Sequence, residues 1–425
     1  MKNKKRIIGK LILFIILASL VVFLFFFFKD KDDTLEPSEP SAEEPNNPSE
    51  PEEPVLDPVG TNYLNNVSGE VDEAVQKVVV EFLNVYYNSI KNLEENDMTY
   101  LFLDPNSESA LINQTALSLL IETRKLKPND LSLDKAKYDL EFTDVNVEGD
   151  TVTLTVLEDN YLNFNFMKDI ESRVYNIKNE FTLEKVDDTY KIVEYNKVQD
   201  FYVMITDVYN GGGASRLEEI EEDYLDLINE KLEEDREDYQ QFLNGTGIET
   251  KTCDHSYDRD KALEHALKWV DDRDPDWIEF SSNCQNFASQ VLYSGGIPMD
   301  YYGSASEYLQ WKLYDGSYNE NQVAQGYVYT WTYVPYFYTY AKDNTGYGLC
   351  ADVDVNLYYA EAGDVIHVGT TGPTRHALVV IGDYKVDGKT VDILVNSNTV
   401  DLENYPISAY SYPYLSLIKV YGWNE

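Results

Sequence analysis

Cys284 is the residue in this chain whose type and setting point most directly to chemistry. It stands in the segment FSSNCQNFASQVLYSGG, where Ser, Ser and Asn precede it as helix-capping types, an apolar i, i+4 face follows, and Gly295-Gly296 supply a stop. The pattern places Cys284 in the first turn of a helix. Unpaired N–H groups and the positive end of the helix dipole stabilise a thiolate there, and the N–H of Cys284 itself would lie near a developing oxyanion. Taken alone, such a cysteine is more often a structural residue, so a positioned base decides the question.

Two of the four histidines, His367 and His376, fall on predicted strands downstream of the cysteine. His376 begins a strand, HALVVIGDY, and a three-residue hairpin loop at residues 386–388 would lead into the next strand, VDILVNSN. This register sets Asn398 directly opposite His376. A two-residue turn at Asp387-Gly388 would instead set Thr399 opposite, and Asn396 has the same strand parity as Asn398.

A thiolate, an imidazole base and a polar residue that fixes the imidazole tautomer are the parts needed for acyl transfer by a cysteine triad. The sequence therefore predicts Cys284, His376 and Asn398 as catalytic residues, with Asn396 as the second choice for the orienting group. His367 fits sheet packing as well as catalysis.

Four motifs in order resemble the putative amidase domain of Gram-positive bacteria, which is grouped with the papain-like cysteine hydrolases. They are YDRDKALEHALKWV, FSSNCQNFASQVLYSGGIPM, YVYTWTYVPYFYTYA, and AGDVIHV with RHALVVIGDY. The resemblance covers about residues 254–425 and implies Cys284 as nucleophile and His376 as base. The family's pattern ends in a His-Thr-x-Asp-like strand, whereas this chain has Asn398, Thr399, Val400 and Asp401, so Asp401 is a further candidate for a supporting role.

The rest of the chain predicts an α+β fold class and several separate parts. Helical patterns near residues 68–90 and 110–124 precede alternating strands, so 61–210 is predicted to be an α+β domain, loosely like nuclear transport factor-like or cystatin-like folds. This domain shows no catalytic constellation and is predicted to have a structural or binding role. A charged connecting helix is expected within 211–250, and the papain-like cysteine amidase domain within 254–425.

The N-terminus predicts a membrane anchor. Residues 11–28 carry no charge and would cover roughly 27 Å of hydrocarbon as a helix. The lysine-rich residues 1–10 predict a cytoplasmic N-terminus. The Pro/Glu-rich residues 29–60 predict an extended spacer through a cell wall. A cleaved signal peptide is the rival interpretation, but small residues do not follow the apolar run.

Charge and cysteine content bear on the partners, the disulfide pairing and the metal binding of this chain. A formal net charge of −42 argues against nucleic acid and other anionic polymers as electrostatic partners. Three cysteines are too few for a disulfide scaffold; Cys253 and Cys350 could pair and leave Cys284 free. Cys253-x-His255 has metal-like spacing without a second pair, so neither a metal nor a cofactor is predicted.

Together these features predict a membrane-anchored extracellular cysteine hydrolase that cleaves amide bonds, in cell-wall peptides or related substrates. The alternative is a catalytically inactive papain-like protein that binds the wall or a partner. Transfer of the acyl group to an amine instead of water also remains open, because both acceptors use the same thioester.

Overall fold

The structure is a computed structural model that describes residues 64–68, 71–197, 200–303, 309–314, 323–324, 326–399 and 401–425. The predicted anchor at 11–28 and spacer at 29–60 lie outside these residues. Among the residues described, no helix combines the length and the apolar character that a membrane crossing needs. Helices and a large, mostly antiparallel sheet confirm the predicted α+β class.

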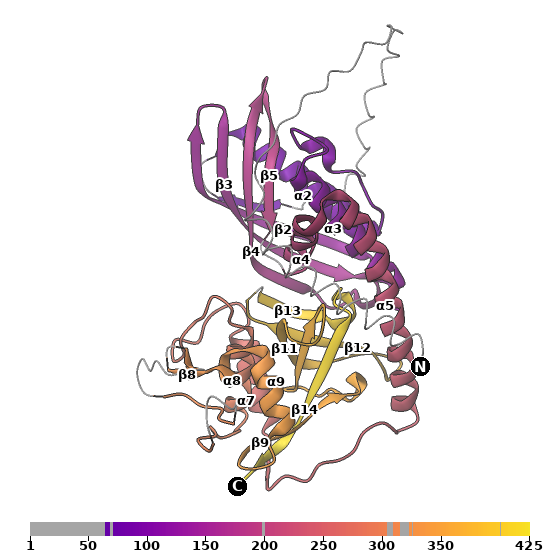
Figure 1. Ribbon diagram of the computed structural model, residues 1–425, viewed down its shortest axis with the longest axis vertical. Coiled ribbons are helices and arrows are strands. Elements are labelled where there is room, and N and C mark those ends of the chain that lie inside the picture. The colour runs from indigo at the N-terminus through magenta and orange to yellow at the C-terminus, as the bar shows by residue number, and fades with distance from the viewer. Residues whose placement is uncertain are drawn as a thin grey trace, which may run out of the picture. The chain divides into compact units, whose positions relative to one another are not determined.

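Two helices and four long strands form the first half of the described chain (Figure 1). Helices α2 (Glu73–Asn92) and α3 (Glu108–Leu126) precede β2 (Leu133–Glu148), β3 (Thr151–Phe164), β4 (Ser172–Val186) and β5 (Thr189–Lys197). Helix α2 begins at Asp72, whose side chain accepts a hydrogen bond from the N–H of Ala74 at 2.8 Å, and ends where Leu93 takes a left-handed conformation. The helices and strands predicted here from periodicity are confirmed.

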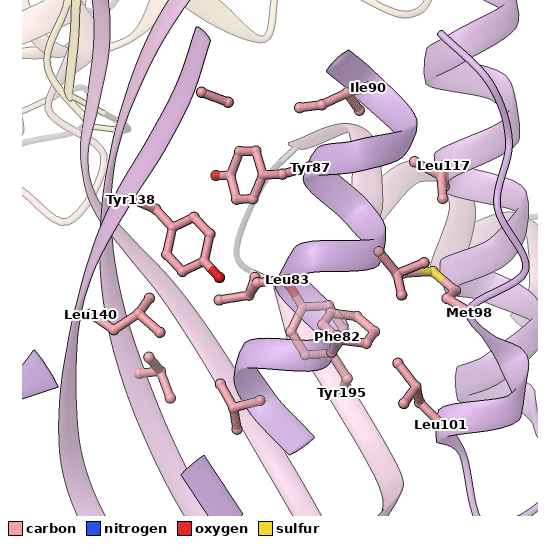
Figure 2. Packing of buried hydrophobic residues seen from close by; sticks show 14 of the residues in the cluster. Phe82, Leu83, Tyr87, Ile90, Met98, Leu101, Leu117, Tyr138, Leu140 and Tyr195 are labelled. Atoms are coloured by element: carbon pink, nitrogen blue, oxygen red, sulfur yellow. The ribbon is translucent and has the colours of Figure 1, made fainter. Parts of the chain in front are cut away.

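The core of this half lies between α2, α3 and the sheet, and aromatic rings fill much of it (Figure 2). Tyr87 of α2 stacks on Tyr138 of β2 with ring centroids 5.1 Å apart, and Phe82 packs against Tyr195 of β5 at 4.5 Å. Such pairs add to the burial of large apolar surface, and truncating one buried phenylalanine typically costs about 3–5 kcal/mol of stability.

Within the described residues the main sheet has 12 strands, and it continues from the first half into the second. Strand β4 makes this link, because its residues 173–175 pair with β13 (Asp401–Pro406) and its residues 179–186 pair with β5. Leu56–Glu425 accordingly form one compact unit. The other strands of the sheet are β1 (Leu64–Ser68), β6 (His255–Ser256), β9 (Gly348–Val355), β10 (Val365–Gly369), β11 (His376–Val386), β12 (Lys389–Ser397) and β14 (Tyr414–Asn424).

Helices cover the second half of the sheet around a separate core. Helix α7 (Cys284–Ser294) lies beside α6 (Arg259–Lys268) and α8 (Tyr329–Thr332) and packs on β11, while α9 (Val334–Asp343) packs on β9. The remaining elements are α4 (Asp200–Gly212), the predicted charged helix α5 (Ala214–Leu243), and the short pair β7 (Val323–Ala324) and β8 (Tyr327–Val328).

A disulfide joins Cys253 to Cys350, with Cα atoms 6.1 Å apart, and ties the segment before β6 to β9. This resolves the pairing that the sequence left open. Cys284 remains the free, buried thiol of the chain.

Candidate functional site

The start of α7 is built to hold Cys284 at the first helical position. Asn283 occupies the N-cap position, but its side chain makes no capping hydrogen bond to the helix backbone. Its Oδ1 instead accepts from the Phe280 N–H at 3.1 Å and from Asn286 Nδ2 at 2.9 Å, which fixes the loop before the cysteine. The N–H groups of the first turn therefore remain directed at whatever lies before the helix.

The thiol of Cys284 has a lowered pKa despite being only 2% exposed. Burial by itself raises this pKa, because it disfavours the charged form. The positive charge of His376, a hydrogen bond between the two side chains, and backbone hydrogen bonds from Ala377 and Gln285 together outweigh burial. The sulfur thus has the environment of an activated nucleophile, and the structure brings it together with the predicted base.

His376 is the first residue of β11 and meets Ser397, the last residue of β12. The Oγ of Ser397 lies 2.9 Å from Nε2 of His376, and the same hydroxyl donates to the carbonyl oxygen of Ala377 at 3.2 Å. A hydroxyl carries one hydrogen, so if it is given to Ala377, the His376 Nε2–H must be the donor to Ser397. The tautomer that satisfies all three groups therefore carries its proton on Nε2.

The predicted register of this hairpin is wrong by one residue. Val386 pairs with Lys389 around a two-residue turn, in which Asp387 and Gly388 have φ values of 52° and 77°. Positive φ at both positions is the type I′ geometry, whose twist matches that of the flanking strands. Near the site Val379 accordingly pairs with Asn396, and a one-residue slip moves every side chain to the other face.

Because of this slip, the hydrogen bonds of Asn398 and Asn396 lead away from the imidazole. Asn398 accepts from Asn283 Nδ2 at 2.7 Å and donates to the Trp269 carbonyl at 3.1 Å, so it holds Asn283, the residue before Cys284. Asn396 donates to the Ala266 carbonyl at 3.1 Å. The structure has the two-residue turn that was the alternative in the sequence, for which the Asp-Gly pair is a strong signal. Ser397, which the sequence did not single out, precedes Thr399 by two residues and so has the same strand parity, and it is the side chain that meets the imidazole.

Asp401 and Thr399, the other polar residues at this end of the hairpin, also support the loop. Asp401 binds Arg273 at 3.1 and 3.2 Å and accepts from the Thr399 N–H at 2.9 Å. The hydroxyl of Thr399 accepts from the N–H of Asn283. These contacts link the end of β12 to the segment that carries Cys284.

His367 lies on β10 beside Ala377 and is fully buried. Its Nε2 is 2.8 Å from Gln285 Oε1, and burial, with a smaller contribution from His376, lowers its pKa to about 3. It is therefore neutral at physiological pH and has the surroundings of a core residue.

His376 lines a cavity of about 540 Å³ that extends into the first half of the chain. Ser282, two residues before Cys284, also lines it, together with Thr374, Arg375 and Tyr333. Cavities of this size hold small-molecule and peptide-sized groups.

No group of histidine, cysteine or acidic residues in the described parts of the chain is arranged to hold a metal ion. The Cys253-x-His255 spacing does not provide a site, because the Cys253 sulfur is held in the disulfide. The ring of His255 stacks on Trp423 at 3.9 Å.

Comparison with known proteins identifies the second half of the chain. Residues 256–422 match the family described as "Putative amidase domain", which confirms the family resemblance noted in the sequence. An "Uncharacterized protein YhbB" of Bacillus subtilis (strain 168) is 33% identical over 150 residues. The match covers 34% of this chain and 42% of that relative, so the chain spans less than half the relative's length.

Among solved structures, a crystal structure entitled as a putative aromatic ring hydroxylase from Novosphingobium aromaticivorans aligns with 31% of this chain and 99% of that one. The sequence identity is 11% and the TM-score is 0.21, which carries no argument about fold or function.

Proposed function

We propose that residues 256–422 form a cysteine amidase in which Cys284 is the nucleophile, His376 the general base and Ser397 the residue that orients the imidazole. The observation that carries this proposal is the geometry of the site: Cys284 is the first residue of α7, and its buried thiol is hydrogen-bonded to the side chain of His376. The lowered pKa of the thiol is consistent with this arrangement. The amidase family match makes an amide the expected substrate. Ser397 takes the role that the sequence assigned to Asn398, whose amide braces Asn283 instead.

In the proposed reaction, Sγ of Cys284 attacks the carbonyl carbon of the amide and forms a tetrahedral oxyanion. His376 then gives its proton to the leaving nitrogen, the C–N bond breaks, and a thioester on Cys284 remains. A water molecule, deprotonated by His376, attacks the thioester and releases the acid. Since Nε2 is engaged with Ser397, Nδ1 is the ring nitrogen that exchanges the proton with sulfur and substrate.

The N–H of Cys284 is the proposed donor to the oxyanion. It belongs to the first turn of α7, where backbone N–H groups have no partner within the helix. A preorganised N–H in a site screened from water stabilises charge that develops in the transition state.

We further propose that the enzyme works outside the cell on cell-wall peptides. The support is the uncharged segment 11–28, the basic residues before it and the Pro/Glu-rich spacer after it, which would hold the acidic body away from a membrane.

The test is digestion of purified Gram-positive cell walls by the full chain, with mass spectrometry of the released fragments. We expect new free amino and carboxyl groups at one type of amide bond. Cys284→Ala and His376→Ala should each abolish the release, and the double variant should be no worse than either single one, because the two groups act in the same step. If Cys284→Ala releases the same fragments, the proposal is wrong. If an added amine is found attached to the products in place of water, the enzyme transfers acyl groups.

A further inference from the structure

Two buried cations line the cavity beside His376. Arg124 of α3 is 4% exposed and Lys197 of β5 is 9% exposed, and both line the cavity. Most of the other lining residues are aromatic or aliphatic, including Phe82, Tyr86 and Leu117.

The donors of Arg124 are mostly unused within the chain. Its Nη2 donates to the Tyr405 hydroxyl at 3.1 Å, and its guanidinium lies over the Phe164 ring at 5.6 Å. Its Nε and Nη1 atoms are buried and have no hydrogen-bond partner among the described residues. Buried N–H groups without a partner carry a free-energy cost, so an acceptor on a ligand in the cavity would be favoured there.

Lys197 adds a second positive charge to the same region. Its ammonium lies 4.9 Å from the centre of the Tyr86 ring. Burial raises the pKa of the Tyr405 hydroxyl, and the charges of Arg124 and Lys197 act in the opposite direction. Among the ion pairs of the described residues, neither cation has a carboxylate partner.

The cavity also offers an acceptor for a ligand N–H. Asn160 of β3 lines it and donates through Nδ2 to the Tyr87 hydroxyl at 3.0 Å, while its buried Oδ1 has no partner among the described residues. Two cations, one amide oxygen and aromatic walls are complementary to an acylated amino acid or peptide with an apolar body and a free carboxylate.

We propose that this cavity is the substrate-binding pocket of the amidase, and that Arg124 and Lys197 bind a carboxylate on an apolar or aromatic amide substrate. This inference rests on the proposed function for the reaction at Cys284, but the binding that it predicts does not depend on turnover. The first half of the chain would then select the substrate, and the second half would cleave it. In a chain with a net charge of −42, a locally cationic cavity attracts an anion only through such short-range contacts.

The test compares two ligands that differ only in charge, N-acetyl-phenylalanine and N-acetyl-phenylalaninamide. Each is titrated calorimetrically into the full chain carrying Cys284→Ala, so that no turnover interferes. We expect the carboxylate to bind at least tenfold more tightly than the amide. Arg124→Gln should reduce this preference below threefold, Lys197→Gln should reduce it partly, and Arg124→Lys should keep part of it.

The matched control is Arg236→Gln on α5, because Arg236 is an exposed arginine whose ion pair with Glu233 lies at the surface. It should leave the preference unchanged. Thermal melting of Arg124→Gln checks folding, and its melting temperature should not fall, since removing an uncompensated buried cation relieves a cost.

Equal binding of the two ligands, or the same loss in Arg236→Gln as in Arg124→Gln, would overturn the inference, as would a preference for phenyl phosphate over the carboxylate. Carboxylate-selective binding without any turnover by the unmodified chain would support the pocket and count against the proposed function. Turnover of amides without carboxylate selectivity would support the proposed function and count against the pocket.

Discussion

Replacing Ser397 by alanine tests the assignment of the orienting residue more directly than any change to the nucleophile or base. The Ser397 hydroxyl is fully buried and lies 2.9 Å from Nε2 of His376. When Cys284 is a thiolate, His376 is the cation beside it, and Ser397 accepts the Nε2–H of that cation. Alanine removes this acceptor.

The size of the effect follows from the kind of hydrogen bond that is lost. A bond to a charged group contributes about 1.5–3 kcal/mol, and the lower value corresponds to about one pKa unit. Loss of the bond destabilises the imidazolium, so the thiolate–imidazolium pair reverts to the neutral thiol and imidazole more readily. The pKa of Cys284 should therefore rise by about one unit in Ser397→Ala.

The assay is the rate of Cys284 alkylation by iodoacetamide as a function of pH, followed by mass spectrometry of the intact chain. Because Cys253 and Cys350 are joined in the disulfide, the signal under native conditions comes from one thiol. Below the pKa of the thiol, alkylation of Ser397→Ala should be about tenfold slower than that of the unmodified chain. At high pH, where the thiol is ionised in both, the two rates should converge.

Ser172→Ala is the matched control, since Ser172 is also fully buried and donates to a backbone carbonyl, that of Asn404, at 2.8 Å. It should leave the pH profile unchanged. An unchanged profile in Ser397→Ala, or a shift in Asn398→Ala larger than that in Ser397→Ala, would refute the assignment and return the orienting role to Asn398.

Three further predictions concern stability and the second histidine. His367→Phe should keep wall digestion and the pH profile of Cys284 alkylation, because burial holds the pKa of His367 at about 3 and the residue is already neutral; loss of both would make it part of the catalytic site. The disulfide closes a loop of sequence separation 97, so its reduction should lower the free energy of unfolding by about 4–5 kcal/mol. Urea denaturation with and without reductant measures this, and an unchanged midpoint would contradict the prediction. Burial raises the pKa of Asp392 to about 6, above its unfolded value near 3.9, so the folded state binds the extra proton and this group's contribution to stability is lost as pH rises from about 4 through 6. Asp392→Asn lacks this loss, so its free energy of unfolding relative to that of the unmodified chain should rise by about 2–3 kcal/mol between pH 4 and pH 7.5 in urea denaturation. A difference that stays constant with pH would refute the assignment.

Much of the secondary structure was predictable because it depends on short-range patterns. The α5 helix lies within residues 211–250, where a charged connecting helix was predicted, and α2 and α3 lie near the helical patterns at 68–90 and 110–124. Cys284 begins α7 as the capping pattern indicates. In each case residues within one or two turns of each other determine the conformation.

The orienting residue could not be assigned with the same certainty, because it depends on strand register. Both loop lengths at residues 386–388 were compatible with the sequence, and they put opposite faces of β12 beside His376. The structure has the two-residue turn, so Ser397 contacts the imidazole and Asn398 holds Asn283. A difference of one residue in a turn thus changed which side chain meets the base.

The cavity lay beyond what the sequence alone could indicate. Arg124 and Lys197 are 73 residues apart in the chain, and both are more than 150 residues from His376, with no motif that relates the three. They share one cavity because β4 pairs with β13 and joins the two halves into a single sheet. The sequence by itself indicated the candidate nucleophile, the candidate base and the elements that carry them, since these follow from residue type and local periodicity. Only the tertiary structure decided the orienting residue and the walls of the pocket, since both depend on pairing between strands that are distant in the chain.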